Sequence, residues 1–209
     1  MKEKIYKLIE YIKYCLYSPL TYFYYRNKSV SKINLCGSGL LGYCNIDMYS
    51  TADLVIDLSK HILPIKSGSA DVVVCISAIN YFSRNRGEEI IRDVYRILKS
   101  GGIARFAVQD LLEISRKYVN GNKDFFFQKY NGRDRFKGET MCDKINSWFY
   151  GYGYKGREKY MYDYETLSLL FKRTGFSLVE QKKYLESRIP DIHKIDNRPD
   201  QMFFLEAVK

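Results

Sequence analysis

The residues of this sequence with the clearest chemical potential form a glycine-rich turn. Gly37, Gly39 and Gly42 follow the short apolar run of residues 33–35 in the order GxGxxG. Glycines let the backbone approach a ligand, leave volume for it, and allow N–H groups to point at it from the end of a strand. The pattern predicts a nucleotide-type binding turn, although many α/β folds use glycine here for tight turning alone.

Two aspartates follow this turn, Asp47 and Asp57. In a dinucleotide-binding fold, an acid about 20 residues after the turn accepts hydrogen bonds from ribose hydroxyls. Asp57 meets that spacing. However, residues 58–70 would then have to hold a helix, another strand and two loops, and they include Pro64. This segment is too short, so the sequence disfavours a nicotinamide dinucleotide.

A second arrangement places Asp47 at the end of the second strand and Asp57 at the end of the third. Ligands of open parallel sheets bind outside the carboxyl ends of the strands. Both carboxylates are therefore expected to open onto one crevice, one facing ribose hydroxyls and the other an adenine amino group. Leu58 offers its backbone and an apolar side chain to the adenine ring. The alternative is that Asp57 caps the turn of residues 58–60.

The elements that must position these residues alternate between short apolar strands and helices. Strands are predicted at 33–35, 43–48, 53–57, 71–76, 103–108, 176–181 and 202–208, and helices at 5–16, 88–99 and 164–174. We expect Ser18-Pro19 to end the first helix, Ser100-Gly101-Gly102 the second and Gly175 the third. Such a succession predicts an α/β domain with a mainly parallel sheet and an antiparallel C-terminal edge hairpin.

The chain divides into two parts on composition. Residues 1–31 form an amphipathic helix and an aromatic, basic segment, which either packs on the flank of the domain or contacts a membrane surface. Residues 32–209 form the domain. Within it, residues 111–163 are rich in aromatic residues and glycine, which predicts an irregular insertion with one or two helices that roofs the sheet.

Composition excludes several classes of protein. The 209 residues include 34 Lys+Arg and 24 Asp+Glu, a net charge of +10, and 46% are hydrophobic, enough for a real core. No apolar run approaches the ~20 residues that span a bilayer, and no signal peptide is evident. Five cysteines without a CxxC pair disfavour a disulfide scaffold or a structural metal site and predict a cytoplasmic location. The positive charge permits nucleic acid, anionic lipid or a phosphorylated small molecule as partner.

Several motifs together resemble the class I S-adenosylmethionine-dependent methyltransferases, in particular the short type 11-like family. The matching segments are Leu35–Gly39, Gly42–Asp47, Asp57-Leu58, Leu63-Pro64, Asp71–Val74, Tyr95–Gly102, Val108–Leu111, Lys159–Asp163, Gly175-Phe176, Glu186–Pro190 and Leu205–Lys209. The resemblance covers residues 32–209. It implies a Rossmann-like class I methyltransferase fold with S-adenosyl-L-methionine (SAM) as cofactor and S-adenosyl-L-homocysteine (SAH) as product.

The resemblance also implies which residues contact the cofactor. The turn cradles its methionine part, Asp47 and Met48 lie at the ribose, Asp57 and Leu58 lie at the adenine, and Ser77 and Asn80 lie beside the path of the methyl group. The complete set is Leu35, Cys36, Gly37, Ser38, Gly39, Asp47, Met48, Asp57, Leu58, Ser77 and Asn80.

Similar proteins are often associated with cell-surface polysaccharides. The resemblance therefore implies a small-molecule acceptor, a sugar or glycan-type hydroxyl such as that of a sugar nucleotide or a lipid-linked glycan. Aromatic side chains of the insertion are candidates to stack on sugar faces: Trp148, Tyr150, Tyr152 and Tyr154. That they simply pack the insertion is the alternative.

A hydroxyl or protonated amine acceptor requires a base. Asp110 at the end of the fifth strand is the leading candidate, followed by His193 and Tyr81, with His61 and Asp143 as further possibilities. An Asn/Asp-Pro-Pro-aromatic motif and a Pro-Cys dipeptide are both absent from the sequence, which disfavours DNA methylation. The basic charge keeps RNA methylation open as an alternative.

The sequence departs from the family pattern at three places. Cys36 stands where a first glycine is usual, residues 40–42 are too few for the usual crossover helix, and Asn80-Tyr81 replaces a common Glu-His pair. These departures leave open a catalytically inactive protein that keeps the fold and uses it for binding.

Overall fold

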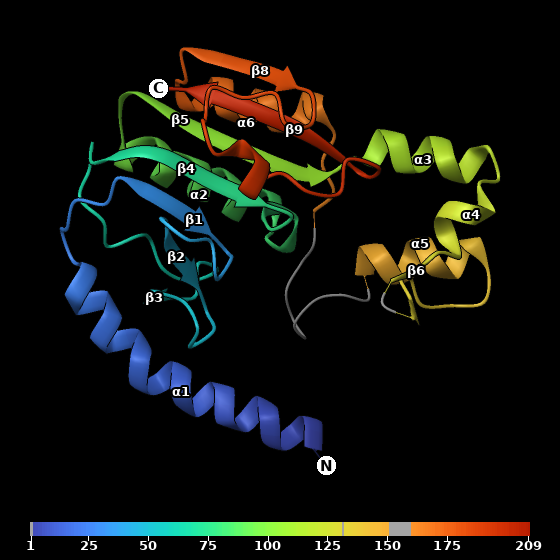
Figure 1. The fold of residues 1–209 in the computed structure, drawn as a ribbon, viewed down its shortest axis with the longest axis horizontal. Coiled ribbons are helices and arrows are strands. Elements are labelled where there is room, and N and C mark those ends of the chain that lie inside the picture. Colours follow the sequence, from blue (N-terminus) through green and yellow to red (C-terminus); the bar gives the residue numbers. More distant parts are fainter. Residues whose placement is uncertain (1, 131, 151–159) are drawn as a thin grey trace.

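The computed structural model describes residues 2–130, 132–150 and 160–209 around a central seven-stranded sheet (Figure 1). The strands lie in the order β3 (Leu54–Val55), β2 (Cys44–Asp47), β1 (Lys32–Leu35), β4 (Ala70–Ile76), β5 (Leu98–Gln109), β9 (Met202–Val208) and β8 (Leu178–Lys182). β3, β2, β1, β4 and β5 pair in parallel, whereas β9 runs antiparallel to both β5 and β8. The predicted mainly parallel sheet with an antiparallel C-terminal hairpin is confirmed.

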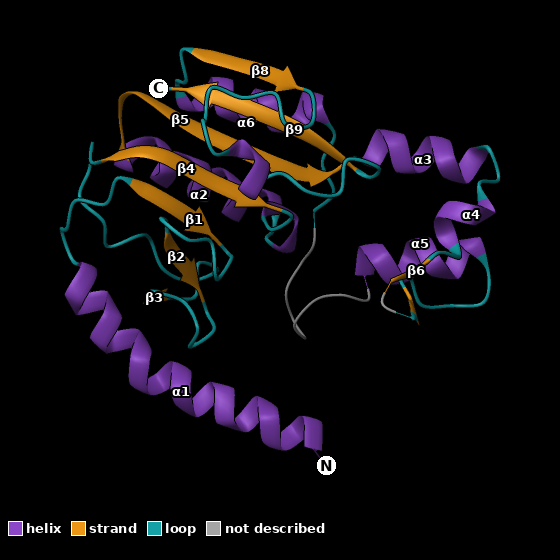
Figure 2. Ribbon diagram, in the orientation of Figure 1, coloured by secondary structure: helices purple, strands orange, loops and turns teal. Residues whose placement is uncertain are grey.

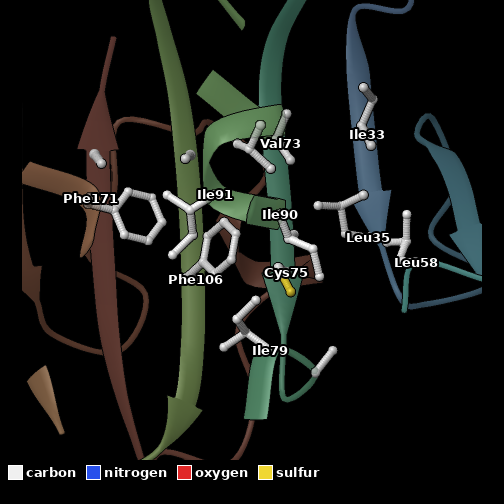
Figure 3. Close-up of a cluster of buried hydrophobic side chains, with 14 of the residues drawn as sticks. Ile33, Leu35, Leu58, Val73, Cys75, Ile79, Ile90, Ile91, Phe106 and Phe171 are labelled. Atoms are coloured by element: carbon white, nitrogen blue, oxygen red, sulfur yellow. The ribbon is translucent and has the colours of Figure 1, made fainter. Parts of the chain in front are cut away.

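One face of the sheet is covered by two helices, α2 (Arg84–Ile97) and α6 (Tyr164–Thr174), as Figure 2 shows. Successive side chains of β4 alternate between the two faces of the sheet, so Val73 and Cys75 point into this layer. There they meet Ile90 and Ile91 of α2 in the main hydrophobic core, which continues through Phe106 and Phe171 (Figure 3). Gly175, in the left-handed conformation, ends α6 as predicted.

The opposite face of the sheet is covered by connecting segments instead of long helices. Residues 36–43, which join β1 to β2, contain a turn and no helix, consistent with their short length. The long connection between β8 and β9, with the short helix η2 (Ile192–Lys194), supplies Ile189, Ile192 and Ile195. These residues pack on Val72 and Val74, the outward-alternating residues of β4.

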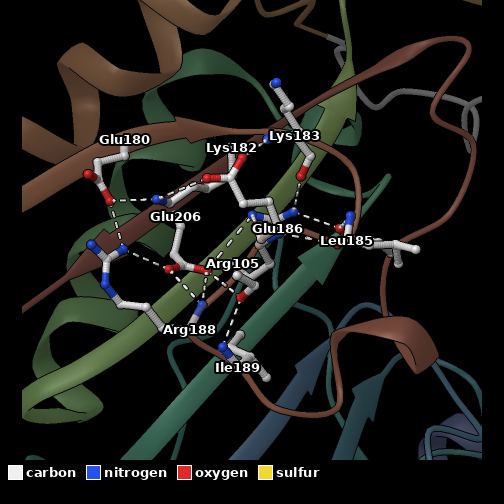
Figure 4. A network of polar contacts seen from close by, with 11 residues as sticks. Arg105, Glu180, Lys182, Lys183, Leu185, Glu186, Arg188, Ile189 and Glu206 are labelled. Atoms are coloured by element: carbon white, nitrogen blue, oxygen red, sulfur yellow. Dashed lines mark hydrogen bonds and ion pairs between the residues drawn. The ribbon is translucent and has the colours of Figure 1, made fainter.

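A buried charge network fastens this connection to the sheet (Figure 4). Arg105 of β5 is fully buried and pairs with the equally buried Asp196 at 2.6 Å. The guanidinium also donates to the backbone carbonyls of Glu186 and Lys183. Glu206 of β9 lies 3.8 Å from the Arg105 guanidinium. The connection is thus fixed by both hydrogen bonds and charge.

The N-terminal helix does not end at Pro19. The helix α1 runs from Lys2 to Tyr25 with Pro19 inside it, so the prediction that Ser18-Pro19 stops it was wrong. The reason is tertiary packing beyond the proline: the backbone N–H of Val55 in β3 donates to Thr21 Oγ1 at 3.0 Å, and Tyr22 and Tyr25 pack against the core. None of the described helices is long and apolar enough to cross a membrane.

Two other boundaries differ from the prediction. The helix α2 ends at Ile97, and residues 100–102 lie inside β5 instead of capping the helix. A Cβ on Gly102 would lie 3.0 Å from the Ala70 carbonyl, and the pairing of β4 with β5 shifts register here, so Gly102 serves a close strand contact, whereas Gly101 adopts a positive φ of 77°. The third strand is reduced to Leu54–Val55, which pair with Ile46 and Asp47 at the end of β2.

Among its described residues, the insertion contains three helices, α3 (Leu111–Val119), α4 (Lys123–Phe126) and α5 (Met141–Tyr150), more than the one or two predicted. It also holds a small hairpin of β6 (Lys129–Tyr130) and β7 (Arg133–Asp134). Figure 1 shows α3–α5 beyond the carboxyl end of β5. Phe125, Phe126 and Phe136 form a separate small core with Ile114, so these aromatic side chains stabilise the insertion itself.

Candidate active site

Two turns with unusual backbone conformation lie side by side at the carboxyl edge of the sheet. Cys36 follows β1 with φ 55°, and Ser77 follows β4 with φ 60°, both in the left-handed region that glycine favours. Leu35, just before Cys36, pairs with Cys75, two residues before Ser77, and this β1–β4 register brings the turns together. Left-handed non-glycine residues cost free energy and concentrate at functional sites. The neighbouring strand ends therefore form the candidate site.

The glycine-rich turn is held by a buried amide. Asn45 Oδ1 accepts hydrogen bonds from Asn34 Nδ2 at 2.9 Å and from the Leu40 backbone N–H at 3.0 Å. Its Nδ2 donates to the Tyr43 carbonyl and to Asp53 Oδ2, both at 3.1 Å. One side chain thus joins β1, the turn and the start of β3. The sequence analysis missed Asn34, Asn45 and Asp53.

Glycine is required at the positions of this turn for different structural reasons. A Cβ on Gly37 would lie 2.7 Å from Asn34 Nδ2, so packing on a neighbouring side chain excludes any larger residue there. Gly39 and Gly42 have positive φ, and a Cβ on either would meet nothing within 4 Å, so they are required for backbone conformation. The expectation that a side chain at Gly37 or Gly39 would also occupy the volume of a ligand stays a prediction. Ser38 is exposed beside them.

The two aspartates lie at and just beyond the ends of two adjacent strands, β2 and β3. Asp47 ends β2 opposite Val55 of β3, and Asp57 lies two residues beyond Val55. The carboxylate of Asp47 accepts from the Met48 N–H at 2.6 Å. Asp57 is buried and accepts from the N–H and the hydroxyl of Ser59 at 2.9 and 2.6 Å, which is the turn-capping contact considered as an alternative. The two carboxylates thus follow neighbouring strands, and their opening onto one ligand site stays a prediction; Asp57 is also bonded within its turn.

The apolar members of the predicted cofactor set are committed to the core. Leu35 and Leu58 are 1% and 5% exposed and lie close together in the main cluster (Figure 3). Their backbone remains at the strand ends, so any ligand contact from these residues is expected from main-chain atoms. Met48 is half-buried next to Asp47.

Polar side chains are buried at the ends of β4 and β5. Gln109 Nε2 donates to Ser77 Oγ at 2.5 Å. Gln109 Oε1 and Asn80 Oδ1 are buried and have no hydrogen-bond partner in the described part of the chain. Buried acceptors are nearly always satisfied, so two of them at one sheet edge indicate a ligand that donates there. Gln109 was missed in the sequence, although a polar residue that ends an otherwise apolar strand is a usable signal.

The three candidate bases are placed differently. Asp110 begins α3 directly after β5, and its Oδ1 accepts from the N–H groups of Leu112 and Glu113. Burial raises the pKa of Asp110 above the usual aspartate value. Tyr81 lies in the short helix η1 (Ile79–Tyr81), just after β4, and is 37% exposed.

The remaining candidates lie elsewhere. His193 is exposed on η2, over the face of the sheet that Ile192 covers. Asp143 accepts from the backbone and hydroxyl of Thr140 at the start of α5, and the backbone hydrogen bond lowers its pKa. The side chains of Trp148 and Tyr150, and all of Tyr152 and Tyr154, lie outside the described part of the structure. Their proposed stacking role stays a prediction.

Comparison with known proteins identifies the domain. Residues 45–106 match the family described as a methyltransferase domain. This part of the chain is therefore similar to a methyltransferase domain. A SAM-dependent methyltransferase from Archaeoglobus fulgidus superposes with a TM-score of 0.51 at 13% identity, over 98% of this chain and 99% of that one. Another, from Mesorhizobium loti, gives 0.50 at 16% identity over 88% and 93%.

These structural similarities, at such identities, show the shared fold, and the sequence match over residues 45–106 supports methyl transfer as the activity. No curated protein matches the chain.

The polar groups at these strand ends fit SAM as the cofactor. The cofactor carries hydrogen-bond donors on its amino group, ribose and adenine, and the strand ends present acceptors. These are the carboxylate of Asp47 and the buried carbonyl oxygens of Asn80 and Gln109. A donor from the ligand would satisfy both carbonyls, whose burial without a partner is otherwise unfavourable.

Proposed function

We propose that the methyltransferase binds SAM across the carboxyl ends of β2, β1 and β4 and methylates an oxygen of a sugar or related small molecule. The observation that carries the cofactor position is the pair of unsatisfied buried carbonyls, Asn80 Oδ1 and Gln109 Oε1, beside the left-handed turns at Cys36 and Ser77. These features lie at one sheet edge, where ligands of parallel sheets bind.

Each part of the cofactor has a proposed set of partners. The backbone of Leu35, Cys36, Gly37, Ser38 and Gly39 holds the methionine part, and Asp47 with Met48 holds the ribose. The main chain at Asp57 and Leu58 borders the adenine, because the Asp57 carboxylate is bonded to Ser59 and the Leu58 side chain is in the core. Ser77 and Asn80 border the methyl group.

Bound SAM would supply an electrophilic methyl group on a sulfonium, open to in-line attack by an acceptor oxygen. The protein supplies alignment and a dry environment. Gln109 fixes the Ser77 hydroxyl, so the floor of the crevice is rigid where the acceptor must approach. Asp110, at the end of the next strand, is the proposed base. It takes the hydroxyl proton as the oxygen–methyl bond forms and the carbon–sulfur bond breaks.

The raised pKa of Asp110 supports this assignment, because a carboxylate that holds a proton more strongly is a better base near neutral pH. Tyr81, across the ends of β4 and β5, is the second candidate. Of the three candidate bases, His193 has the weakest support, because it is exposed over the face of the sheet.

The acceptor class is proposed from the sequence resemblance and from the aromatic, basic character of the chain. A sugar nucleotide or lipid-linked glycan combines a ring for aromatic stacking with a phosphate for basic side chains. The cysteine pattern of the sequence supports the cytoplasm as the compartment, because thiols without disulfide partners persist in a reducing environment.

Transfer of radiolabelled methyl groups from SAM tests this function. We expect label in sugar nucleotides or glycan lipids, and we expect Asp110→Asn to lower kcat and to shift its pH profile, whereas His193→Ala retains activity. Label in RNA, with strongly salt-dependent RNA binding, would favour the alternative of RNA methylation. Binding of SAH without transfer to any acceptor class would favour an inactive binding protein.

A further inference from the structure

The N-terminal helix α1 presents its apolar side to solvent. Seven residues at spacings of three or four form one stripe along the helix, with exposed fractions from 44% to 68%: Ile5, Leu8, Ile9, Ile12, Leu16, Leu20 and Phe23. We call this set the apolar stripe. Amphipathic helices of globular proteins normally turn this side toward the core. In the described part of the chain, nothing covers it.

The other side of α1 is the one that contacts the domain. Glu10 accepts from Ser50 Oγ at 3.4 Å, and Thr21 Oγ1 accepts from the Val55 N–H at 3.0 Å. Tyr22 and Tyr25 pack against the core. Figure 1 shows the helix running past the β3 edge, with its N-terminal half leading away from the sheet. The polar contacts thus fix α1 with the apolar stripe outward.

We propose that α1 lies in the plane of an anionic membrane surface, with the apolar stripe in the lipid. Charge favours this occupant: residues 1–32 contain seven basic and two acidic residues. Four exposed tyrosines flank the stripe, namely Tyr6, Tyr11, Tyr17 and Tyr24. Tyrosine prefers the headgroup region of a bilayer, and basic residues are attracted to anionic lipid. This composition is typical of interfacial helices.

A second copy of the chain is less well supported as the occupant. Paired helices usually carry opposite charges beside the apolar seam. The acidic side chain of α1 whose contacts are described is that of Glu10. It faces Ser50 and pairs with Lys13, so it does not flank the apolar stripe. Pro19 also lies along the stripe and interrupts the regular side-chain packing that a helix pair requires.

Membrane binding by α1 would bring the crevice close to the lipid. Ser50, which contacts the middle of the helix, lies three residues after Asp47 at the end of β2. An acceptor carried by a lipid would then reach the site without leaving the membrane. This last step rests on the proposed function, whereas the binding of α1 to lipid does not.

Vesicle cosedimentation of the full chain, without SAM or acceptor, tests the proposal. We expect binding to phosphatidylcholine vesicles that contain phosphatidylglycerol and much weaker binding to phosphatidylcholine alone. Leu16→Glu and Leu20→Glu should each weaken binding about tenfold or more, because each removes a buried leucine from the lipid. Leu169→Glu is the matched control: this leucine is exposed on α6, away from the stripe, and its variant should bind like the native chain.

Three results would overturn the proposal. The first is that the native protein does not bind anionic vesicles. If the native protein is then a dimer that Leu16→Glu converts to a monomer, the apolar stripe is assigned to a second copy of the chain. The second is equal binding to neutral and anionic vesicles. The third is unchanged binding of the Leu16 and Leu20 variants. Because the stripe is exposed, unfolding curves of these variants should match that of the native chain and exclude misfolding.

Discussion

Asn80 and Gln109 each bury a carbonyl oxygen that finds no partner among the described residues. A buried acceptor without a hydrogen bond lowers stability by about 1–3 kcal/mol. Such a cost is tolerated where a ligand supplies the missing donor. The free methyltransferase is therefore expected to be less stable than its complex with the cofactor, and these two residues should account for part of the difference.

Replacement of Asn80 separates stability from binding. Asn80→Leu keeps a similar volume and removes the unsatisfied oxygen, so the free energy of unfolding should stay equal or rise by about 1 kcal/mol. SAH affinity should fall about tenfold, since a hydrogen bond to the ligand is lost. Denaturant unfolding and calorimetry measure the two effects. Asn146→Leu, an exposed replacement on α5, is the control, and a clear loss of stability in Asn80→Leu would contradict the assignment.

Asp163 provides a pH-dependent contribution at the start of α6. The hydrogen bond from the Thr166 N–H, 2.8 Å from Asp163 Oδ1, lowers the pKa of Asp163. A lowered folded-state pKa gives stability that is present above the unfolded value, ~3.9, and is lost as the pH falls through the folded value. Asp163→Ala should therefore lower the free energy of unfolding by about 1 kcal/mol at neutral pH and by less in acid.

Ser83→Ala is the matched control for this effect. Ser83 caps α2 through its hydroxyl, which accepts from the Arg86 N–H and does not titrate. The loss for Ser83→Ala should be the same at neutral and acid pH. Equal pH dependence in the two variants would show that the Asp163 carboxylate is not the titrating cap.

The sequence was sufficient for some site residues and not for others. The turn at Gly37 and the aspartates Asp47 and Asp57 follow from local patterns, because each lies within two residues of the end of a predicted strand. Asn45 and Gln109 could not be recognised in this way. Their partners come from neighbouring strands, Asn34 and Ser77, and pairing between strands is not encoded in local spacing.

At the scale of secondary structure, the central strands and the amphipathic helices that pack on them were predicted well. The β-branched run of β4 and the stripe of α6 have a strong local signal. Boundaries failed where contacts with other elements decide them. Pro19 is tolerated in α1 because residues beyond it pack on β3, and residues 100–102 extend β5 because β4 lies against them.

The connection between β8 and β9 depends on Arg105. Arg105→Leu leaves Asp196 and Glu206 buried with less compensating charge, which should lower the free energy of unfolding by about 3–5 kcal/mol. Lys99→Leu is the control, because its pair with Asp71 is half exposed and should contribute less than about 1 kcal/mol. Thermal and denaturant unfolding provide the measurement, and similar losses in both variants would contradict a structural role of the buried network.

At the scale of the whole molecule, the sheet order brings β1 and β4 together although 34 residues separate their ends. The fold class could be predicted from the alternation of strands and helices and from the resemblance. The way in which the second face of the sheet is covered could not be predicted. In place of crossover helices, a C-terminal connection held by a buried arginine fills that side, which frees α1 to lie at the edge with its apolar stripe outward.

The central claim is that a nucleoside occupies the crevice at the ends of β1, β2 and β4. Calorimetric titration of SAH tests it with the native chain, Asp47→Ala and Asp71→Ala. Asp71 is an exposed aspartate near the opposite end of β4, bonded to Ser31 and Lys99, and serves as the control. We predict binding by the native chain and by Asp71→Ala, with affinity at least about tenfold lower in Asp47→Ala. Absence of binding by the native chain, or equal affinity in Asp47→Ala, would contradict the account.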